Sequence, residues 1–237
     1  MDIISLKTEM EFRGYSKSTQ RTYTRTVKDF LNVVNKDTLE IKKEDVIEYL
    51  DNNLSLVDPN TILVKLNALS FFFIEVLGID IISSIRKYKR DFKKKDFINL
   101  DEFNILVASV GERESLVYLI LFETGFQLKE IISLRLTEIE TLLSSSLYRR
   151  ILKYCDKYGI EKKIFNITEE TLRNKNRENT VKFLGKHYSF NDLRHSIALE
   201  KYLKKGDEAK AQEYLGNKTL ASIRQYYRRA GYDYTKK

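Results

Sequence analysis

The sequence predicts a mainly α-helical protein made of two bodies, with little or no β-sheet. Its 237 residues include one proline and nine glycines, the residue types that helices exclude. Apolar residues recur at helical spacing, and no alternating run is long enough to build a substantial sheet. The run RKYKRDFKKK at residues 86–95 holds seven basic side chains against one acid and has no apolar face of its own. We therefore expect a first domain at 1–85, a basic linker at 86–98 and a second domain at 99–237.

The charge distribution predicts a polyanionic partner. The net charge is +8, and residues 141–237 alone carry 22 basic and 11 acidic side chains. Together with the basic linker, this segregation favours a protein whose two bodies hold nucleic acid between them, although a lysine-rich proteome would also raise the lysine content. No apolar run approaches the ~20 residues that a membrane span needs. The start MDIISLKTEMEF does not read as a signal peptide, and a single cysteine, Cys155, fits a reducing compartment, so we expect a cytoplasmic protein without a membrane partner.

Three helices are predicted in the first domain. One is capped by Ser16 or Ser18 and runs to Val34, and a second covers residues 42–52. The third begins at Asp58-Pro59, a cap followed by proline in the first turn, and extends to Val76 through the aromatic run FFF. The face of the first helix that lies opposite its apolar residues forms a basic stripe: Lys17, Arg21, Arg25 and Lys28. This stripe is a candidate DNA contact, although an ordinary solvated face would have the same pattern.

The first half of the second domain is predicted to be helical around one buried element. Asn99 and Glu102 form a capping-box pattern. Residues 116–123 (LVYLILFE) are apolar on all sides, which is typical of a central helix, and Gly125 can end that helix in a left-handed turn. A further helix is predicted from Gln127 to about Leu136. Helical pattern resumes at Ser144, and Ile164-Phe165 reads as a short extended piece.

The C-terminal part is predicted to contain four more helices. Thr168 caps the first, and Asn191 or Asp192 begins the second after a loop at 187–191. Gly206 ends that helix. Short helices follow at 209–214 and from Thr219 onward, and the last of them carries Tyr226 and Tyr227 among arginines. The histidines His187 and His195 lack a Cys/His partner set, so we expect no metal site.

Segments along the whole chain resemble the tyrosine recombinase (phage integrase) family. GYSKSTQRTYTRTVKDFL is similar to the first helix of that family's SAM-like, four-helix core-binding domain, and FINLDEFNILVASV to the entry of its catalytic domain. LILFETGFQLKEIISLRLTEIE resembles the segment with the first catalytic arginine, NDLRHSIAL the His-x-x-Arg box, and LGNKTLASIRQYY the segment that ends at the tyrosine. The resemblance implies a two-domain helical architecture with a C-terminal catalytic-type domain.

It also implies a chemistry, namely DNA strand exchange through a covalent phosphotyrosine. In the family, two arginines and a histidine or tryptophan neutralise the scissile phosphate, a lysine on a β-hairpin protonates the leaving oxygen and a histidine assists proton transfer. No metal, nucleotide or other cofactor is required.

Only two of those catalytic positions are retained in this sequence. Arg194 stands at the second arginine and Tyr226 at the nucleophile. The first arginine, the histidine of the box and the later histidine or tryptophan are replaced, in that order, by Gln127, Asn191 and Asn217. No room remains between Leu136 and Leu147 for the hairpin with the lysine. Lys129 or Arg135 could substitute for a lost cation, but both belong to a helix whose geometry is set by the core.

These losses favour a binding protein over an enzyme. Removing one preorganised charge-stabilising donor costs ~10²–10³ in rate, and a general acid or base contributes ~10²–10⁴. We expect a DNA-binding protein with lost or strongly impaired strand cleavage. The alternatives are an active, divergent recombinase that uses Tyr226, and a protein-interaction module that no longer binds DNA. Arg194 could equally have a structural role inside the fold.

The expected partner is double-stranded DNA, held by basic side chains of both domains and the linker. Arg194 would meet phosphates near the old active site. A homo-oligomer on DNA is also possible through the C-terminal tail YRRAGYDYTKK. The candidate DNA contacts are Lys17, Arg21, Arg25, Lys28, Arg86, Lys87, Lys89, Arg90, Lys93, Lys94, Lys95, Lys218, Arg224 and Arg228.

Overall fold

A computed structural model describes residues 2–54, 57–85, 94–217 and 219–233, and the chain divides into two compact units, 1–92 and 93–237. Most of the predicted linker, residues 86–93, lies outside the described ranges. Residues 94–98 belong to the second unit. In the described ranges the structure is helical, and the only β interaction is an isolated antiparallel bridge between Arg135 and Lys163. The predicted mainly α fold without a sheet is therefore confirmed.

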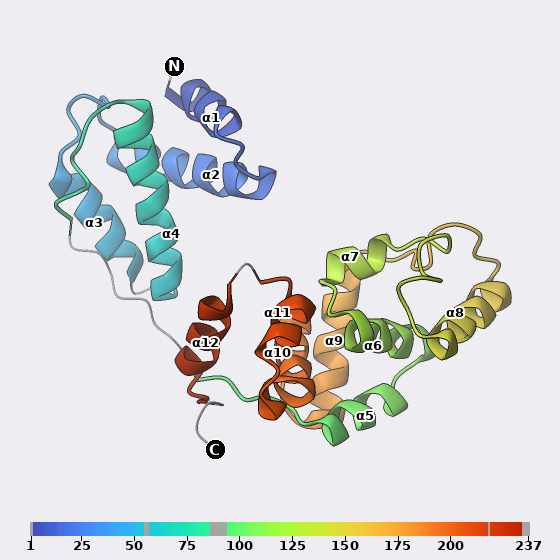
Figure 1. Ribbon diagram of the computed structural model, residues 1–237. Helices are drawn as coiled ribbons and strands as arrows, with labels where there is room; N and C mark the ends of the chain where they lie inside the picture. The colour runs from blue at the N-terminus through green and yellow to red at the C-terminus, as the bar shows by residue number, and fades with distance from the viewer. Residues whose placement is uncertain (1, 55–56, 86–93, 218, 234–237) are drawn as a thin grey trace. The chain divides into compact units, whose positions relative to one another are not determined.

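The first unit contains four α-helices and one π-helical segment in the part of the chain that is described (Figure 1). They are α1 (Asp2–Phe12), α2 (Lys17–Val34), α3 (Lys43–Leu54), α4 (Pro59–Ser70) and η1 (Phe71–Val76). The predicted helix starts are confirmed, because the Ser16 side chain accepts from the amide of Thr19, and that of Asp58 accepts from the amide of Asn60. Helix α1 escaped prediction because its apolar residues do not form one face: Leu6 and Met10 are buried, whereas Ile4 and Phe12 are exposed.

The predicted third helix of this unit changes its winding partway. It is α-helical to Ser70 and π-helical from Phe71 to Val76, where the amide of Leu77 donates to the carbonyl of Phe72. All three consecutive phenylalanines of this segment are buried. Phe73 packs edge-on against Phe30 of α2, so aromatic rings pack among the aliphatic side chains of this core.

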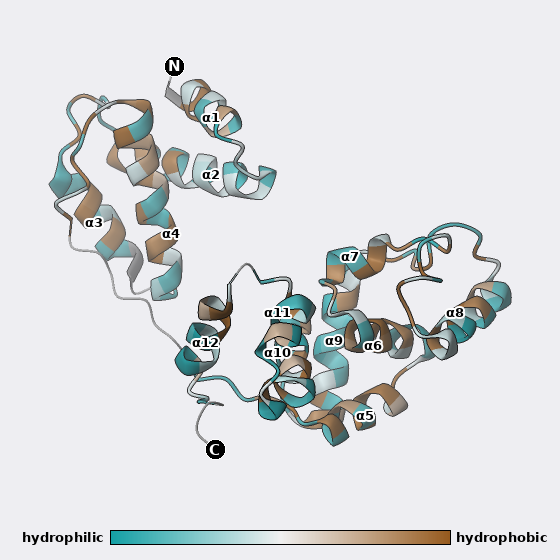
Figure 2. Ribbon diagram, viewed as in Figure 1, coloured by the Kyte–Doolittle hydropathy of each residue, from teal (hydrophilic) through white to brown (hydrophobic). Residues whose placement is uncertain are grey.

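The second unit is built around helix α6 (Glu112–Thr124). Figure 2 shows this helix as a hydrophobic segment near the middle of the unit. Every residue of this helix from Ser115 to Leu121 is buried except Leu119. The predicted central helix is therefore confirmed. Gly125 ends it in the left-handed conformation (φ 67°), also as predicted. The other elements are α5 (Leu100–Ser109), α7 (Leu128–Ser133), α8 (Ser145–Tyr158), α9 (Glu169–Leu184), α10 (Phe190–Lys201), η2 (Leu203–Lys205), α11 (Glu208–Leu215) and α12 (Leu220–Arg229).

Helix α7 is shorter than predicted, and turns occupy the stretch where the family pattern would place a hairpin. The helix ends at Ser133 instead of Leu136, because the chain leaves it to pair with residues 162–164: the amide of Leu136 donates to the carbonyl of Lys162, and that of Ile164 to the carbonyl of Leu134. Residues 137–143 form turns before Ser144 caps α8. The predicted lack of room for a β-hairpin is thus observed in this region.

Helix α10 begins earlier than the sequence predicted, at Phe190 instead of Asn191 or Asp192. Ser189 is the cap, and a reciprocal capping box joins its hydroxyl and amide to Asp192. Asn191 therefore lies in the first turn of the helix. The helix also ends earlier than predicted, at Lys201, and a short 3₁₀ turn continues the chain to Gly206.

The segment 94–98 holds the C-terminal helix in place. The Lys95 amide donates to the carbonyl of Ala230 (3.0 Å), and the Ile98 amide donates to the hydroxyl of Ser196 (3.1 Å). The ring of Phe97 packs on those of Tyr227 and Tyr232. Helix α12 is thereby fixed against α10. None of the helices in the described ranges is long and apolar enough to cross a membrane.

Candidate phosphate-binding site

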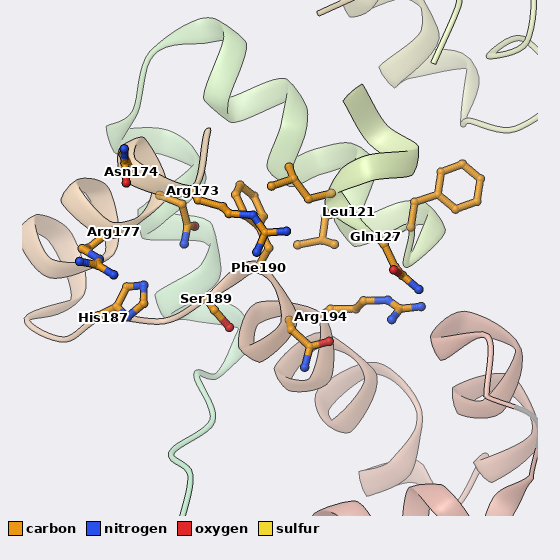
Figure 3. Close-up of a pocket in the computed structure, with 13 residues that line it drawn as sticks. Leu121, Gln127, Arg173, Asn174, Arg177, His187, Ser189, Phe190 and Arg194 are labelled. Carbon is orange, nitrogen blue, oxygen red and sulfur yellow. The ribbon is translucent and has the colours of Figure 1, made fainter. Parts of the chain in front are cut away.

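Three of the five predicted site positions line one pocket of about 400 Å³ in the second unit. They are Gln127 at the start of α7, Asn191 in the first turn of α10, and Arg194 one turn further along α10. Figure 3 shows Gln127 and Arg194 at one end of this pocket. Tyr226 and Asn217 are not among its lining residues, and neither are Lys129 and Arg135. We call this pocket the α9–α10 pocket.

Arg194 is a buried charge whose hydrogen bonds go to backbone carbonyls. Its side chain is 9% exposed. Nε donates to the carbonyl of Gly125, and Nη2 donates to that of Leu215 (2.7 Å) and more distantly to that of Tyr214 (3.5 Å). Burial lowers the pKa of this guanidinium, an effect opposed by Tyr214 and Glu130, yet an arginine remains charged in proteins. No carboxylate of a described residue forms an ion pair with it.

Arg194 joins the end of α6 to the end of α11. Its carbonyl acceptors, Gly125 on one side and Tyr214 and Leu215 on the other, lie at the C-terminal ends of those two helices. In the loop after α11, the Asn217 amide donates to the carbonyl of Gln212, and the side chain of Gln212 donates to the carbonyl of Asn217. The guanidinium of Arg194 therefore completes the hydrogen bonding of two helix C-termini.

Tyr226 lies on the other side of α10, away from the pocket. Its ring stacks on His195, with the centroids 3.8 Å apart and the planes 15° from parallel. Its hydroxyl is buried and has no hydrogen-bond partner among the described residues. Burial raises the pKa of Tyr226, and the nearby Lys95 opposes that shift. Arg194 and His195 are adjacent on α10, but their side chains have different neighbours. Arg194 lines the pocket, whereas His195 contacts Tyr226.

Tyr227 is the packing residue of the tyrosine pair. It is fully buried, and its hydroxyl donates to the backbone carbonyl of His195 (2.6 Å). The imidazole Nδ1 of His195 lies 3.4 Å from the same hydroxyl. Burial lowers the pKa of His195 to about 3, so this imidazole is neutral at physiological pH.

Lys95 covers the Tyr226 ring and ties the segment 94–98 to α10. Its ammonium lies 5.7 Å from the ring centroid and 2.5 Å from the carboxylate of Asp192. Burial alone would raise the pKa of Asp192, but the hydrogen bonds from Lys95 and Ser189 outweigh it and lower that pKa. Lys95, predicted as a DNA contact, is thus engaged within the protein, as is Lys94, whose side chain packs on Gly231.

The predicted basic stripe of the first unit lines a groove between α1 and α2. Lys17, Arg21, Arg25 and Lys28 all border this groove of about 680 Å³, and the structure adds Lys7 from α1 to them. Lys17 forms an ion pair with Glu11 (2.8 Å) across it. The hydroxyl of Thr24, which also lines the groove, is buried without a partner among the described residues.

Only some of the remaining predicted DNA contacts lie within the described residues. Arg224 forms a bidentate ion pair with Glu208 of α11, and Arg228 is exposed on the last turn of α12. Six of the predicted contacts lie outside the described residues, namely Arg86, Lys87, Lys89, Arg90, Lys93 and Lys218.

Sequence reasoning missed the basic residues that complete the α9–α10 pocket. Arg173, Asn174 and Arg177 come from α9, and His187 comes from the turn before α10. Arg173 and Arg177 are four residues apart and so share a face of α9, which is the signal that could have identified them. The prediction for this helix rested only on its cap and its apolar positions.

Comparisons with known proteins agree with this architecture. Residues 4–83 match the family model described as phage integrase, N-terminal SAM-like domain. No curated protein matches the chain in sequence. Among solved structures, lambda integrase as a tetramer bound to a Holliday junction has a TM-score of 0.75 at 15% identity, covering 96% of this chain and 76% of that one.

Two further structures show the same fold. A lambda integrase fragment bound to DNA has a TM-score of 0.74 at 15% identity and covers 100% of this chain and 97% of the other. XerH site-specific recombinase, in a pre-cleavage complex with its difH substrate, has a TM-score of 0.71 at 16% identity, with 95% and 81% covered. The chain therefore has the fold of the tyrosine recombinases, and its first unit carries the SAM-like domain of phage integrases. The predicted resemblance to this family is confirmed.

Proposed function

We propose that this protein binds double-stranded DNA through a tyrosine recombinase fold and has lost, or strongly reduced, strand cleavage. One observation carries the proposal. The α9–α10 pocket gathers Gln127, Asn191 and the buried charge of Arg194, whereas the Tyr226 hydroxyl is buried outside it against His195. The candidate nucleophile therefore does not line the pocket proposed to bind phosphate, and this supports the proposal.

The pocket suits a phosphodiester. Arg194 brings a positive charge that forms no ion pair with a described residue, and an anion in the pocket would pair with it. Gln127 and Asn191 bring neutral amides, which hydrogen-bond phosphate oxygens without adding charge. Such a site holds a ground-state phosphate better than it stabilises the additional charge of a transition state.

Cleavage chemistry has little support at this site. The hydroxyl of Tyr226 has a raised pKa because it is buried, so its nucleophilic phenolate form is disfavoured. The pocket has no lysine among its described lining residues to protonate a leaving oxygen. Two of the family's cationic positions hold Gln127 and Asn191. The single cation retained, Arg194, already donates to three carbonyls.

The first unit supplies a second surface for DNA. The groove of α1 and α2 gathers five basic side chains, of which Lys7 was not predicted. Structures with this fold have been solved on DNA, among them the lambda integrase fragment and XerH. By analogy we expect basic side chains of both units and of the segment 86–94 to contact the DNA backbone, whereas Lys95 is paired with Asp192.

Salt-dependent binding to duplex DNA tests the proposal. We expect fluorescence anisotropy to report binding of a random-sequence duplex whose affinity falls steeply between about 50 and 200 mM salt, because each neutralised phosphate contributes a slope near −0.9. Tyr226→Phe should bind with unchanged affinity. Absence of binding at low salt, or binding that salt does not weaken, would contradict the proposal and favour a protein-interaction module.

One observation favours an alternative, a divergent active recombinase. The buried Tyr226 hydroxyl lacks a hydrogen-bond partner among the described residues, and such a group gains free energy by moving to a polar site. If α12 shifted on DNA, the tyrosine could approach the pocket. A covalent protein–DNA adduct that Tyr226→Phe abolishes would establish this alternative.

Assembly on DNA is a further part of the proposal. Lambda integrase has been solved as a dimer and as a tetramer on DNA, which supports a homo-oligomer here. In this structure Tyr232 packs on Phe97 of its own chain, and its amide donates to the carbonyl of Tyr227. A role of the C-terminal tail in assembly stays a prediction. The cytoplasm remains the predicted compartment.

A further inference from the structure

The lining of the α9–α10 pocket has a charge that the family's catalytic positions do not explain. Its described residues include three arginines and a histidine, and no aspartate or glutamate. Two of the arginines, Arg173 and Arg177, come from α9 (Figure 3). Two further pockets among the described residues mix both signs, with Glu112 in one and Glu11 in the other. Of these three pockets, the α9–α10 pocket is the one most suited to an anion.

Helix α9 is held rigidly with its basic face at this pocket. Asn176, which is 2% exposed, donates to the carbonyl of Tyr188 (2.6 Å) and accepts from the hydroxyl of Tyr118 on α6 (3.0 Å). The hydroxyl of Thr180 accepts from the amide of Tyr188 (3.2 Å). These buried hydrogen bonds fix the rotation of α9 relative to α6 and to the turn at 185–189. Arg173 and Arg177 consequently stay on the pocket side.

Both α9 arginines are available to a ligand. Arg177 is exposed and forms no ion pair with any described residue. Arg173 pairs with Glu169 one turn earlier (2.8 Å), but its side chain is 65% exposed, and exposed pairs of this kind contribute only about 0–1 kcal/mol. In Figure 3, Arg173 lies between Arg194 at one end of the pocket and Arg177 with His187 at the other.

We propose that Arg173 and Arg177 of α9 form a phosphate clamp that replaces the cations lost at positions 127 and 191. This inference rests on the proposed DNA-binding function and names the side chains that carry it out. The ligand is a backbone phosphodiester of duplex DNA. The guanidinium groups bind its oxygens, Arg194 adds a charge from the pocket floor, and Gln127 and Asn191 add neutral hydrogen bonds. The clamp binds a phosphate and takes no part in breaking it.

The test compares arginine-to-glutamine variants at matched surface positions. Arg173→Gln and Arg177→Gln remove the clamp, and Arg150→Gln is the control, because Arg150 is exposed on α8 and does not line the pocket. Anisotropy with a random-sequence duplex is measured across a salt series. We expect the double variant Arg173→Gln/Arg177→Gln to bind at least about tenfold more weakly, with a salt slope shallower by roughly 0.9 for each phosphate that the variant no longer neutralises. Arg150→Gln should keep the wild-type slope.

Thermal unfolding in inorganic phosphate gives a second readout. Because a ligand that binds only the folded state raises the melting temperature, millimolar phosphate should stabilise the wild type and Arg150→Gln but not the double variant. Salt-dependent DNA binding by the wild type that the double variant fully retains would overturn the clamp and leave the DNA-binding proposal intact. Wild-type protein that does not bind DNA at low salt would overturn both.

Discussion

Arg194 and His195 are adjacent residues whose side chains leave α10 in different directions and perform different tasks. The guanidinium of Arg194 joins two helix C-termini beside the α9–α10 pocket, and the imidazole of His195 stacks on Tyr226 and meets the hydroxyl of Tyr227. The family resemblance predicts that Arg194 and Tyr226 hold retained catalytic positions. It does not indicate that only Arg194 lines the pocket, because the direction of a side chain depends on tertiary packing.

Acid should destabilise the second unit through His195. The unfolded chain binds a proton at this imidazole near pH 6.5, whereas burial lowers the folded pKa to about 3. Stability is therefore complete above pH 6.5 and is lost as the pH falls from 6.5 toward 3, because the unfolded state takes up the proton first. We expect the melting temperature of His195→Phe to fall less steeply in this range than that of the wild type.

The other histidine provides the control for this measurement. His187 is exposed, and it is the only other histidine of the chain. His187→Gln is the control for the loss of a histidine, and the comparison uses the slopes of melting temperature against pH so that any overall destabilisation by the substitutions cancels. Equal slopes for the wild type and His195→Phe would show that His195 is not the group responsible.

At the scale of elements, the contact between the end of α6 and α11 determines the shape of the site. Gly125 adopts φ 67°, and a Cβ there would lie 2.9 Å from ring atoms of Tyr214 and closer still to its carbonyl oxygen. The same two residues both accept hydrogen bonds from Arg194. A glycine is therefore required at this position both by the backbone conformation and by the approach of α11.

Gly125→Ala should destabilise the protein more than a matched substitution elsewhere. Gly159 ends α8 with a similar φ of 62°, but a Cβ there meets no atom within 4 Å. Gly159→Ala should cost only the left-handed strain of about 1–2 kcal/mol, whereas Gly125→Ala adds a backbone clash and should exceed it by at least about 1 kcal/mol. Chemical denaturation measures both. Equal losses would mean that α11 can move away from α6 without cost.

The elements that the sequence predicted best are those with strong local signals. The predicted caps at Ser16, Asp58, Asn99 and Thr168 all occur, because each combines a polar cap with an apolar periodicity that follows it. Errors arose where packing overrides local preference. Helix α7 ends early to form the bridge with Lys163, and α10 starts at Phe190 because Ser189 and Asp192 cap each other. The pocket face of α9 was missed because only its three-dimensional neighbours give that face a role.

At the scale of the whole molecule, each unit has its own hydrophobic core and its own concentration of positive charge. One core includes the three phenylalanines of η1, and the other surrounds α6. The first unit presents the basic groove and the second the α9–α10 pocket. These surfaces, together with a fold shared with DNA-bound recombinases, support a protein that holds a duplex. Tyr226 does not line the pocket, and this supports the proposal of DNA binding without strand cleavage.

The most direct test of this account is a search for covalent intermediates. A pool of randomised duplexes, each with a nick that traps a phosphotyrosine product, is incubated with the protein and separated on a denaturing gel. We predict salt-dependent binding on a native gel and no covalent adduct, for the wild type and for Tyr226→Phe alike. An adduct that forms with the wild type and disappears in Tyr226→Phe would contradict the account and identify an active recombinase.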